Sequence, residues 1–182
     1  SGKIMLEGVN IRNLNRGEMR PWRTKIQMVF QDPFASLNPR IKVGHVITQG
    51  PIIQGLDRVT AENRARELLE IVGLDMRAFN RYPHEFSGGQ RQRIGIARAL
   101  IMEPEFVVCD EPISALDVSV QAQVVNLLGR LSQELGLTLL FIAHDLSMVR
   151  YVSHRMAVMY LGKLVEIGPA DQVYFSPKHP YS

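Results

Sequence analysis

The hydrophobic positions of this chain form two kinds of pattern that alternate along its length. Three short, mainly apolar runs are typical of buried strands, and they cover residues 26–30, 106–109 and 139–143. Longer stretches with apolar residues at helical spacing separate these runs. The alternation predicts an α/β fold with a mostly parallel sheet. Two further runs, at 156–161 and 163–167, predict a hairpin around Gly162.

Two of the helical stretches have recognisable ends. Residues 61–72 carry apolar side chains three and four positions apart, and Gly73 follows them as a typical residue after a helix end. Residues 118–135 form a longer amphipathic pattern that stops at Gly136. The whole section from 43 to 102 is mostly helical and separates two of the expected strands, which predicts an inserted helical subdomain.

Composition narrows the class of protein. The chain has 182 residues, of which 46% are hydrophobic, enough for one domain with a sizeable core. Its net charge of +3 is small for this length and is not concentrated in a basic stripe, so we expect no nucleic-acid partner. The single cysteine, Cys109, excludes a disulfide framework and a cysteine-based metal site, and is compatible with a reducing cytosol. No signal peptide or apolar run of about 18 residues indicates a membrane span.

Polar residues follow the expected strands, at the edge of the sheet where α/β proteins bind ligands. They are Gln31, Asp110, Glu111 and His144. Adjacent strand residues face opposite ways, so the two carboxylates are expected to take separate roles. One would hold Mg²⁺ and its waters, and the other would orient and deprotonate an attacking water. Pro112 would then stop the strand and bias Glu111 towards an extended conformation. The alternative is an ordinary acidic turn before a helix.

The remaining two strand-end residues suit phosphate chemistry as well. His144 is expected to hydrogen-bond a terminal phosphate, although a lone histidine is often structural. Gln31 can both donate and accept, so it is expected to contact Mg²⁺ or the attacking water.

The stretch FSGGQRQR predicts the start of a helix. Ser87 and Gln90 have the spacing of a capping box. A plain cap does not explain Gly88 and Gly89, because each glycine in a helix costs up to about 1 kcal/mol relative to alanine. Two glycines are useful where a group must approach the backbone closely, and a helix N-terminus is a natural site for a phosphate.

The first three residues, SGK, are similar to the end of a phosphate-binding loop, G-x-x-x-x-G-K-[ST]. Ile4 follows, where the loop needs a hydroxyl group for Mg²⁺, and no strand or glycine-rich turn precedes it. The other Gly-Lys pair, at 162–163, is followed by Leu164. The stretch SGK is therefore expected to be a turn that leads into apolar residues 4–6.

Together these motifs resemble those of the nucleotide-binding subunit of an ABC transporter. MVFQDPFASLNPR resembles the Q-loop, with Gln31 as its glutamine. FSGGQRQR resembles the ABC signature, with Phe86 where many members carry leucine. FVVCDEP is similar to the Walker B motif, SALD to the D-loop and AHD to the switch region.

The resemblance implies a role for each matching residue. It implies that Glu111, His144 and Gln31 are catalytic and that Asp110 and Gln31 serve Mg²⁺. The residues that it assigns to nucleotide binding are Ser87, Gly88, Gly89, Gln90 and Asp117. The implied cofactors are ATP and Mg²⁺, and the implied fold is an ABC-type nucleotide-binding domain, related to the P-loop NTPases and incomplete at its N-terminus.

The stretches around these motifs, and the terminal SPKHPYS, are most similar to the oligopeptide/dipeptide importer class, in particular to its second ATPase subunit. Membership implies a second ATP-binding subunit in a head-to-tail homo- or heterodimer. It also implies two membrane permeases, an extracytoplasmic solute-binding protein and a cytoplasmic location on the inner face of the membrane. Peptides are the first expectation for the solute, with nickel, glutathione or sugars as alternatives within the class.

The expected organisation has three parts. Residues 1–42 would form the first part of a catalytic subdomain, 43–103 a helical subdomain with the signature, and 104–182 the second catalytic part with the start of a C-terminal extension. The chain is expected to be an internal piece of a longer subunit, inactive alone. The alternatives are a soluble non-transport ABC ATPase, or an assembly module without a P-loop that donates only its signature.

Overall fold

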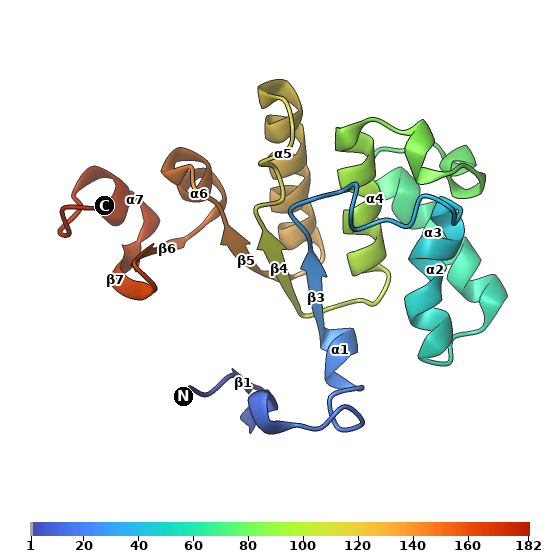
Figure 1. The fold of residues 1–182 in the computed structure, drawn as a ribbon, viewed down its shortest axis with the longest axis horizontal. Helices are drawn as coiled ribbons and strands as arrows, with labels where there is room; N and C mark the ends of the chain where they lie inside the picture. Colours follow the sequence, from blue (N-terminus) through green and yellow to red (C-terminus); the bar gives the residue numbers. More distant parts are fainter. Residues whose placement is uncertain (1) are drawn as a thin grey trace.

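A parallel sheet of three strands forms the centre of the molecule (Figure 1). The computed structural model describes residues 2–182, so Ser1 of the SGK stretch lies outside the described residues. The strands are β3 (Ile26–Val29), β4 (Phe106–Asp110) and β5 (Thr138–Ile142), in the order β3-β4-β5. Val29 lies beside Cys109, and Cys109 beside Phe141. The three apolar runs and their parallel pairing are therefore confirmed, with ends shifted by one residue.

Helices fill the long connection between β3 and β4. These are α2 (Val43–Ile53), α3 (Arg58–Ile71), the 3₁₀ helices η2 (Met76–Asn80) and η3 (Pro83–Glu85), and α4 (Gly88–Leu100). Asp57 caps α3 through a side-chain hydrogen bond from the Thr60 N–H. Gly73 follows α3 with a φ of +78°, a conformation that glycine adopts without strain. The predicted helix and its end are confirmed.

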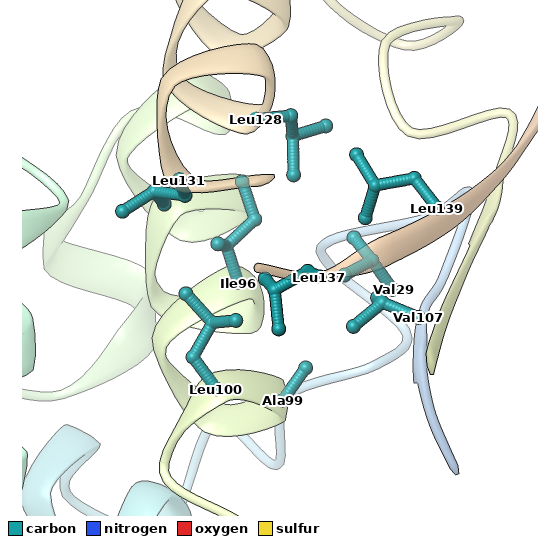
Figure 2. Close-up of a pocket in the computed structure, with 9 residues that line it drawn as sticks. All are labelled: Val29, Ile96, Ala99, Leu100, Val107, Leu128, Leu131, Leu137 and Leu139. Carbon is teal, nitrogen blue, oxygen red and sulfur yellow. The ribbon is translucent and has the colours of Figure 1, made fainter. Parts of the chain in front are cut away.

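The main core runs from helices α2 and α3 to the central sheet, and a second, smaller buried cluster lies at the C-terminal hairpin. Next to the sheet, the main core lies between one sheet face and helices α4 and α5 (Val118–Glu134). Figure 2 shows apolar side chains from this sheet face, α4 and α5 around one small cavity, including Ile96 of α4, Leu128 of α5 and Val107 of β4. The buried residues of β4 alternate with less buried ones, as expected for a strand with unequal faces. Burial raises the pKa of the Cys109 thiol in this core to about 12, so the thiol stays protonated and unreactive.

The other face of the sheet carries exposed apolar side chains. Leu140 and Ile142 of β5 are 47% and 42% exposed. In the paired register, Val108 of β4 and Met28 of β3 share this face with Leu140. The two faces of the sheet therefore differ in how completely they are covered.

Two antiparallel hairpins lie outside the central sheet. The first pairs β1 (Met5–Leu6) with β2 (Val9–Asn10), and a 3₁₀ helix η1 (Ile11–Asn13) and a short α1 (Trp22–Lys25) follow it. The second pairs β6 (Arg155–Tyr160) with β7 (Lys163–Pro169), and α6 (Leu146–Val152) and α7 (Ala170–Phe175) flank it. Leu161 and Gly162 both have positive φ, which suits a two-residue hairpin turn and confirms the predicted hairpin.

Candidate functional site at the carboxyl edge of the sheet

Three of the predicted strand-end side chains meet at the carboxyl edge of the sheet. The Gln31 Nε2 amide donates a hydrogen bond to Glu111 Oε2 at 2.9 Å. The Nδ1 atom of His144 lies 3.8 Å from the same carboxylate oxygen. These residues are far apart in the sequence and follow three different strands, so the parallel sheet is what brings them together.

The backbone of Glu111 has an unusual conformation. Its φ is +42°, in the left-handed region, so the expectation of an extended conformation before Pro112 was wrong. The Glu111 N–H donates to the Ile142 carbonyl at 2.9 Å, and the Glu111 carbonyl accepts from the Ser114 N–H and hydroxyl. These hydrogen bonds offset the cost of a left-handed non-glycine residue, which is of order 1–3 kcal/mol, and turn the side chain towards Gln31 and His144.

Glu111 also borders a hollow on the surface, lined on its other sides by Ser114, Gln121 and His144, among others. The Glu111 side chain is 30% exposed and that of His144 is 75% exposed. Both groups are therefore accessible to a ligand at the sheet edge, and the apolar core lies behind them.

Asp110 is the last residue of β4 and is partly exposed. The described residues contain no cluster of three or more acidic, histidine or cysteine side chains able to enclose a metal ion. Mg²⁺ does not need such a cage, because it usually takes one or two protein oxygens and fills its shell with waters and substrate phosphates. The Gln31 amide uses its nitrogen on Glu111, which leaves its oxygen for a cation. Asp110 and Gln31, at the ends of the neighbouring strands β4 and β3, thus offer oxygens of a kind that would suit a magnesium ion.

His144 is placed by the turn between β5 and α6. Asp145 caps that helix, because its Oδ1 atom accepts from the Ser147 N–H at 2.8 Å and the Ser147 hydroxyl at 2.6 Å. These hydrogen bonds hold the pKa of Asp145 below its ordinary value, and the bond from the Ser147 hydroxyl has the largest effect. No role for Asp145 was predicted from the sequence, although an aspartate directly before a helix is a usual capping residue.

The predicted phosphate site at the start of α4 is a capped helix N-terminus. The Ser87 Oγ accepts from the Gln90 N–H, and the Gln90 Oε1 accepts from the Ser87 N–H, so the capping box is confirmed. Gly88 is partly exposed and an added Cβ would lie 3.4 Å from Leu116. Asp117 begins α5 without a capping bond from its side chain, which leaves its carboxylate for other partners.

Gly89 has a packing reason that the sequence did not reveal. It is buried, and an added Cβ would lie 2.3 Å from Val120 Cγ1, closer than side chains ever approach. The two glycines predicted a close approach of another group to the backbone. At Gly89 the group that approaches is Val120 of helix α5. No hydrogen bond within residues 2–182 joins the capping box at the start of α4 to the Glu111 carboxylate.

Comparison of the sequence with known protein families shows to which family the chain belongs. The sequence model described as "ABC transporter" matches residues 1–114, which is more than half of the chain. The chain belongs to the ABC transporter family. The matched range includes Gln31, the stretch 86–93, Asp110 and Glu111, and so covers most of the site described above.

Curated relatives of this ABC transporter chain are named for peptide transport. The oligopeptide transport ATP-binding protein OppF of Bacillus subtilis is 58% identical over 100% of this chain and 60% of its own length. The dipeptide transport ATP-binding protein DppF of Lactococcus lactis is 57% identical over 100% of this chain and 59% of its own. The ABC transporter chain thus spans about three fifths of the length of these relatives.

Solved structures show that the fold is that of an ABC nucleotide-binding domain. CbiO1 of Clostridium perfringens, part of an ABC transporter complex, superposes with a TM-score of 0.85 and 28% identity over 97% of this chain and 69% of its own. The ATP-binding cassette MJ0796, a dimer bound to ADP and Pi, superposes with a TM-score of 0.81 and 28% identity over 93% and 74%. Within residues 2–182, no helix is long and apolar enough to cross a membrane.

Proposed function

We propose that this chain is part of an ATP-binding and ATP-hydrolysing subunit that powers an importer of oligopeptides or dipeptides. The observation that carries the proposal is the contact of Gln31 and His144 with the Glu111 carboxylate at the carboxyl edge of an ABC-type sheet. The peptide class rests on the relatives, which are named oligopeptide and dipeptide transport proteins.

In the proposed mechanism, Glu111 is the general base of hydrolysis. Its carboxylate would orient a water against the terminal phosphate of ATP. It would take the proton of that water as the new phosphorus–oxygen bond forms and the bond from the terminal phosphorus to the ADP oxygen breaks, so that ADP and phosphate leave. The Gln31 amide holds one carboxylate oxygen at 2.9 Å and keeps it aimed at the edge of the sheet. His144 donates a hydrogen bond to the terminal phosphate. Asp110 and the Gln31 oxygen would hold Mg²⁺, which neutralises charge on the phosphates.

The start of α4 would serve a second nucleotide. Ser87, Gly88 and Gln90 stand at a helix N-terminus, whose backbone N–H groups favour a phosphate. We propose that these residues, with the Gly89 N–H and the Asp117 carboxylate, face ATP held mainly by a second ATP-binding subunit in a homo- or heterodimer.

The proposed assembly rests on the transport names of the relatives. Two permeases would lie above the dimer and receive solute from an extracytoplasmic binding protein, with the subunit on the inner face of the cell membrane. Within the chain, we propose catalytic parts at 1–42 and 104–182 around a helical subdomain at 43–103.

Reconstitution tests the transport function. The complete transporter, with these residues in its ATP-binding subunit, would be placed in lipid vesicles with its binding protein and a labelled oligopeptide. Uptake that requires ATP on the subunit's side of the membrane is the expected result, and nickel, glutathione and sugars should not compete. Hydrolysis coupled to one of those solutes would show that the peptide assignment is wrong, and an absence of hydrolysis would contradict the ATPase assignment.

We also propose that the 182-residue chain alone binds Mg-ATP weakly. Its sequence contains no G-x-x-x-x-G-K-[ST], the loop that supplies backbone N–H groups, a lysine charge and a hydroxyl to the phosphates. Charge-assisted hydrogen bonds contribute roughly 1.5–3 kcal/mol each, so losing three costs about 4 kcal/mol or more. Since 1.4 kcal/mol is about tenfold, a micromolar site weakens to about millimolar.

Calorimetric titration of the purified chain with Mg-ATP measures this directly, and no ATP turnover should accompany the weak binding. The complete subunit, titrated in the same buffer, is the control. Clean micromolar binding by the 182-residue chain would contradict the prediction.

A further inference from the structure

The segment that carries Gln31 is held on both sides by two side chains of helix α4. The Gln92 Nε2 amide donates to the Phe30 carbonyl at 3.4 Å, directly before Gln31. The Arg98 guanidinium donates to the Ser36 carbonyl at 2.5 Å, five residues after it. Each contact joins residues 62 positions apart, so α4 and the Gln31 segment are connected only by the tertiary fold.

Both side chains are unusual for their surroundings. Gln92 is only 1% exposed, and it is one of two buried polar side chains among the described residues. A buried amide destabilises a fold unless it is hydrogen-bonded, and an apolar residue would fill this place more simply. Arg98 is partly buried, and desolvation alone lowers the pKa of its guanidinium. Both side chains hydrogen-bond the backbone of the segment that carries Gln31, and the Arg98 guanidinium also lies over the Phe30 ring, 5.7 Å from its centre.

The segment between the two contacts is itself ordered. Asp32 Oδ1 accepts from the Phe34 and Ala35 N–H groups at 2.7 and 3.2 Å, and the Ser36 N–H donates to the Asp32 carbonyl. Leu37 is 2% exposed and belongs to the core. A shift of α4 would therefore move the whole segment as a unit, with the Gln31 side chain at its start.

We propose that Gln92 and Arg98 are positioning residues, which hold the Gln31 amide against Glu111 and transmit any movement of α4 to it. The inference rests on the proposed function, because α4 is also the helix whose first turn, at Ser87, would face the partner's ATP. One rigid helix of 13 residues would then connect that nucleotide to the hydrolytic carboxylate of this chain.

The test compares two arginines in the complete transporter. Arg98→Met removes the donor to the Ser36 carbonyl and keeps most of the side-chain volume. Arg130→Met is the control, because Arg130 of α5 also donates to a backbone carbonyl, that of Ile71 at 2.9 Å, but does not contact the segment that carries Gln31. We expect Arg98→Met to lower the kcat for ATP hydrolysis about tenfold with KM for ATP changed less than about twofold, and Arg130→Met to change neither.

A double-mutant cycle separates positioning from a general structural defect. In a Gln31→Ala background, Arg98→Met should cause little further loss of kcat, because the group that it positions is already absent. Arg98→Lys, which keeps a donor and the charge, should restore part of the activity. Gln92→Met should lower kcat in the same way. If Arg98→Met does not assemble, Gln92→Met tests the positioning role in its place.

The outcomes are distinct. Additive losses in the cycle, or wild-type kcat in both Arg98→Met and Gln92→Met, would overturn the positioning role. A wild-type transporter without ATPase activity would instead contradict the proposed function itself.

Discussion

Replacing Glu111 with glutamine is expected to reduce ATP hydrolysis by the assembled transporter by about a thousandfold, while ATP remains bound. General-base catalysis typically contributes about 10²–10⁴-fold. The amide has almost the shape of the carboxylate, and its oxygen can still accept a hydrogen bond from Gln31 Nε2. In the unchanged protein this nitrogen lies 2.9 Å from Glu111 Oε2. Because the shape is kept, ATP should still bind. Because the amide cannot accept the proton of the attacking water, hydrolysis should fail.

Steady-state hydrolysis and nucleotide binding by the purified complex measure the two effects separately. Glu105→Gln is a suitable control, because Glu105 lies just before the same strand and forms an exposed ion pair with Lys25 at 2.9 Å. This control should retain the wild-type rate. Turnover by Glu111→Gln at a near wild-type rate would show that another group is the base.

Gly88→Arg is expected to abolish hydrolysis by the assembled transporter while leaving ATP binding by the separate subunit intact. Gly88 is partly exposed at the first turn of α4, and its Cβ position, 3.4 Å from Leu116, leaves room for a side chain directed outwards. That side chain would occupy the space next to the bare N–H groups, where we place the partner's phosphate. The two subunits could then no longer close on ATP.

Gly88→Ala and Gly89→Ala provide a contrast between the two glycines. Gly88→Ala adds only an ordinary contact and should leave thermal unfolding almost unchanged. In Gly89→Ala the new methyl group would collide with Val120, so we expect a stability loss of about 1–3 kcal/mol in thermal unfolding, regardless of nucleotide. The prediction for Gly88 fails if Gly88→Arg abolishes ATP binding by the separate subunit, because this loop would then serve its own nucleotide.

The strands and the chemistry at their ends could be predicted from the sequence because both depend on local patterns. A buried strand of a parallel sheet is a short apolar run, and the polar residue after it lies at the ligand-binding edge. This reasoning identified Gln31, Glu111 and His144, whose contacts the structure shows. The capping box at Ser87 and the turn at Gly162 were predictable for the same reason, since each depends on residues within one turn of the chain.

Other features were decided only by the tertiary structure. The left-handed φ of Glu111 went against the local preference before Pro112, because a hydrogen bond to the Ile142 carbonyl on the neighbouring strand holds it. The need for glycine at position 89 comes from Val120 on another helix, which leaves no space for a side chain there. The burial of Gln92 could not be read from the sequence, because its contact with Phe30 spans 62 residues.

The sequence by itself therefore determined the central strands, the β6–β7 hairpin, the longer helices and which side chains stand at the sheet edge, because hydrophobic period and capping are local properties. The tertiary structure decided the conformation of the proposed base and the support of its partner Gln31. Those depend on distances between residues far apart in the chain, which arise only when α4, α5 and the sheet pack together.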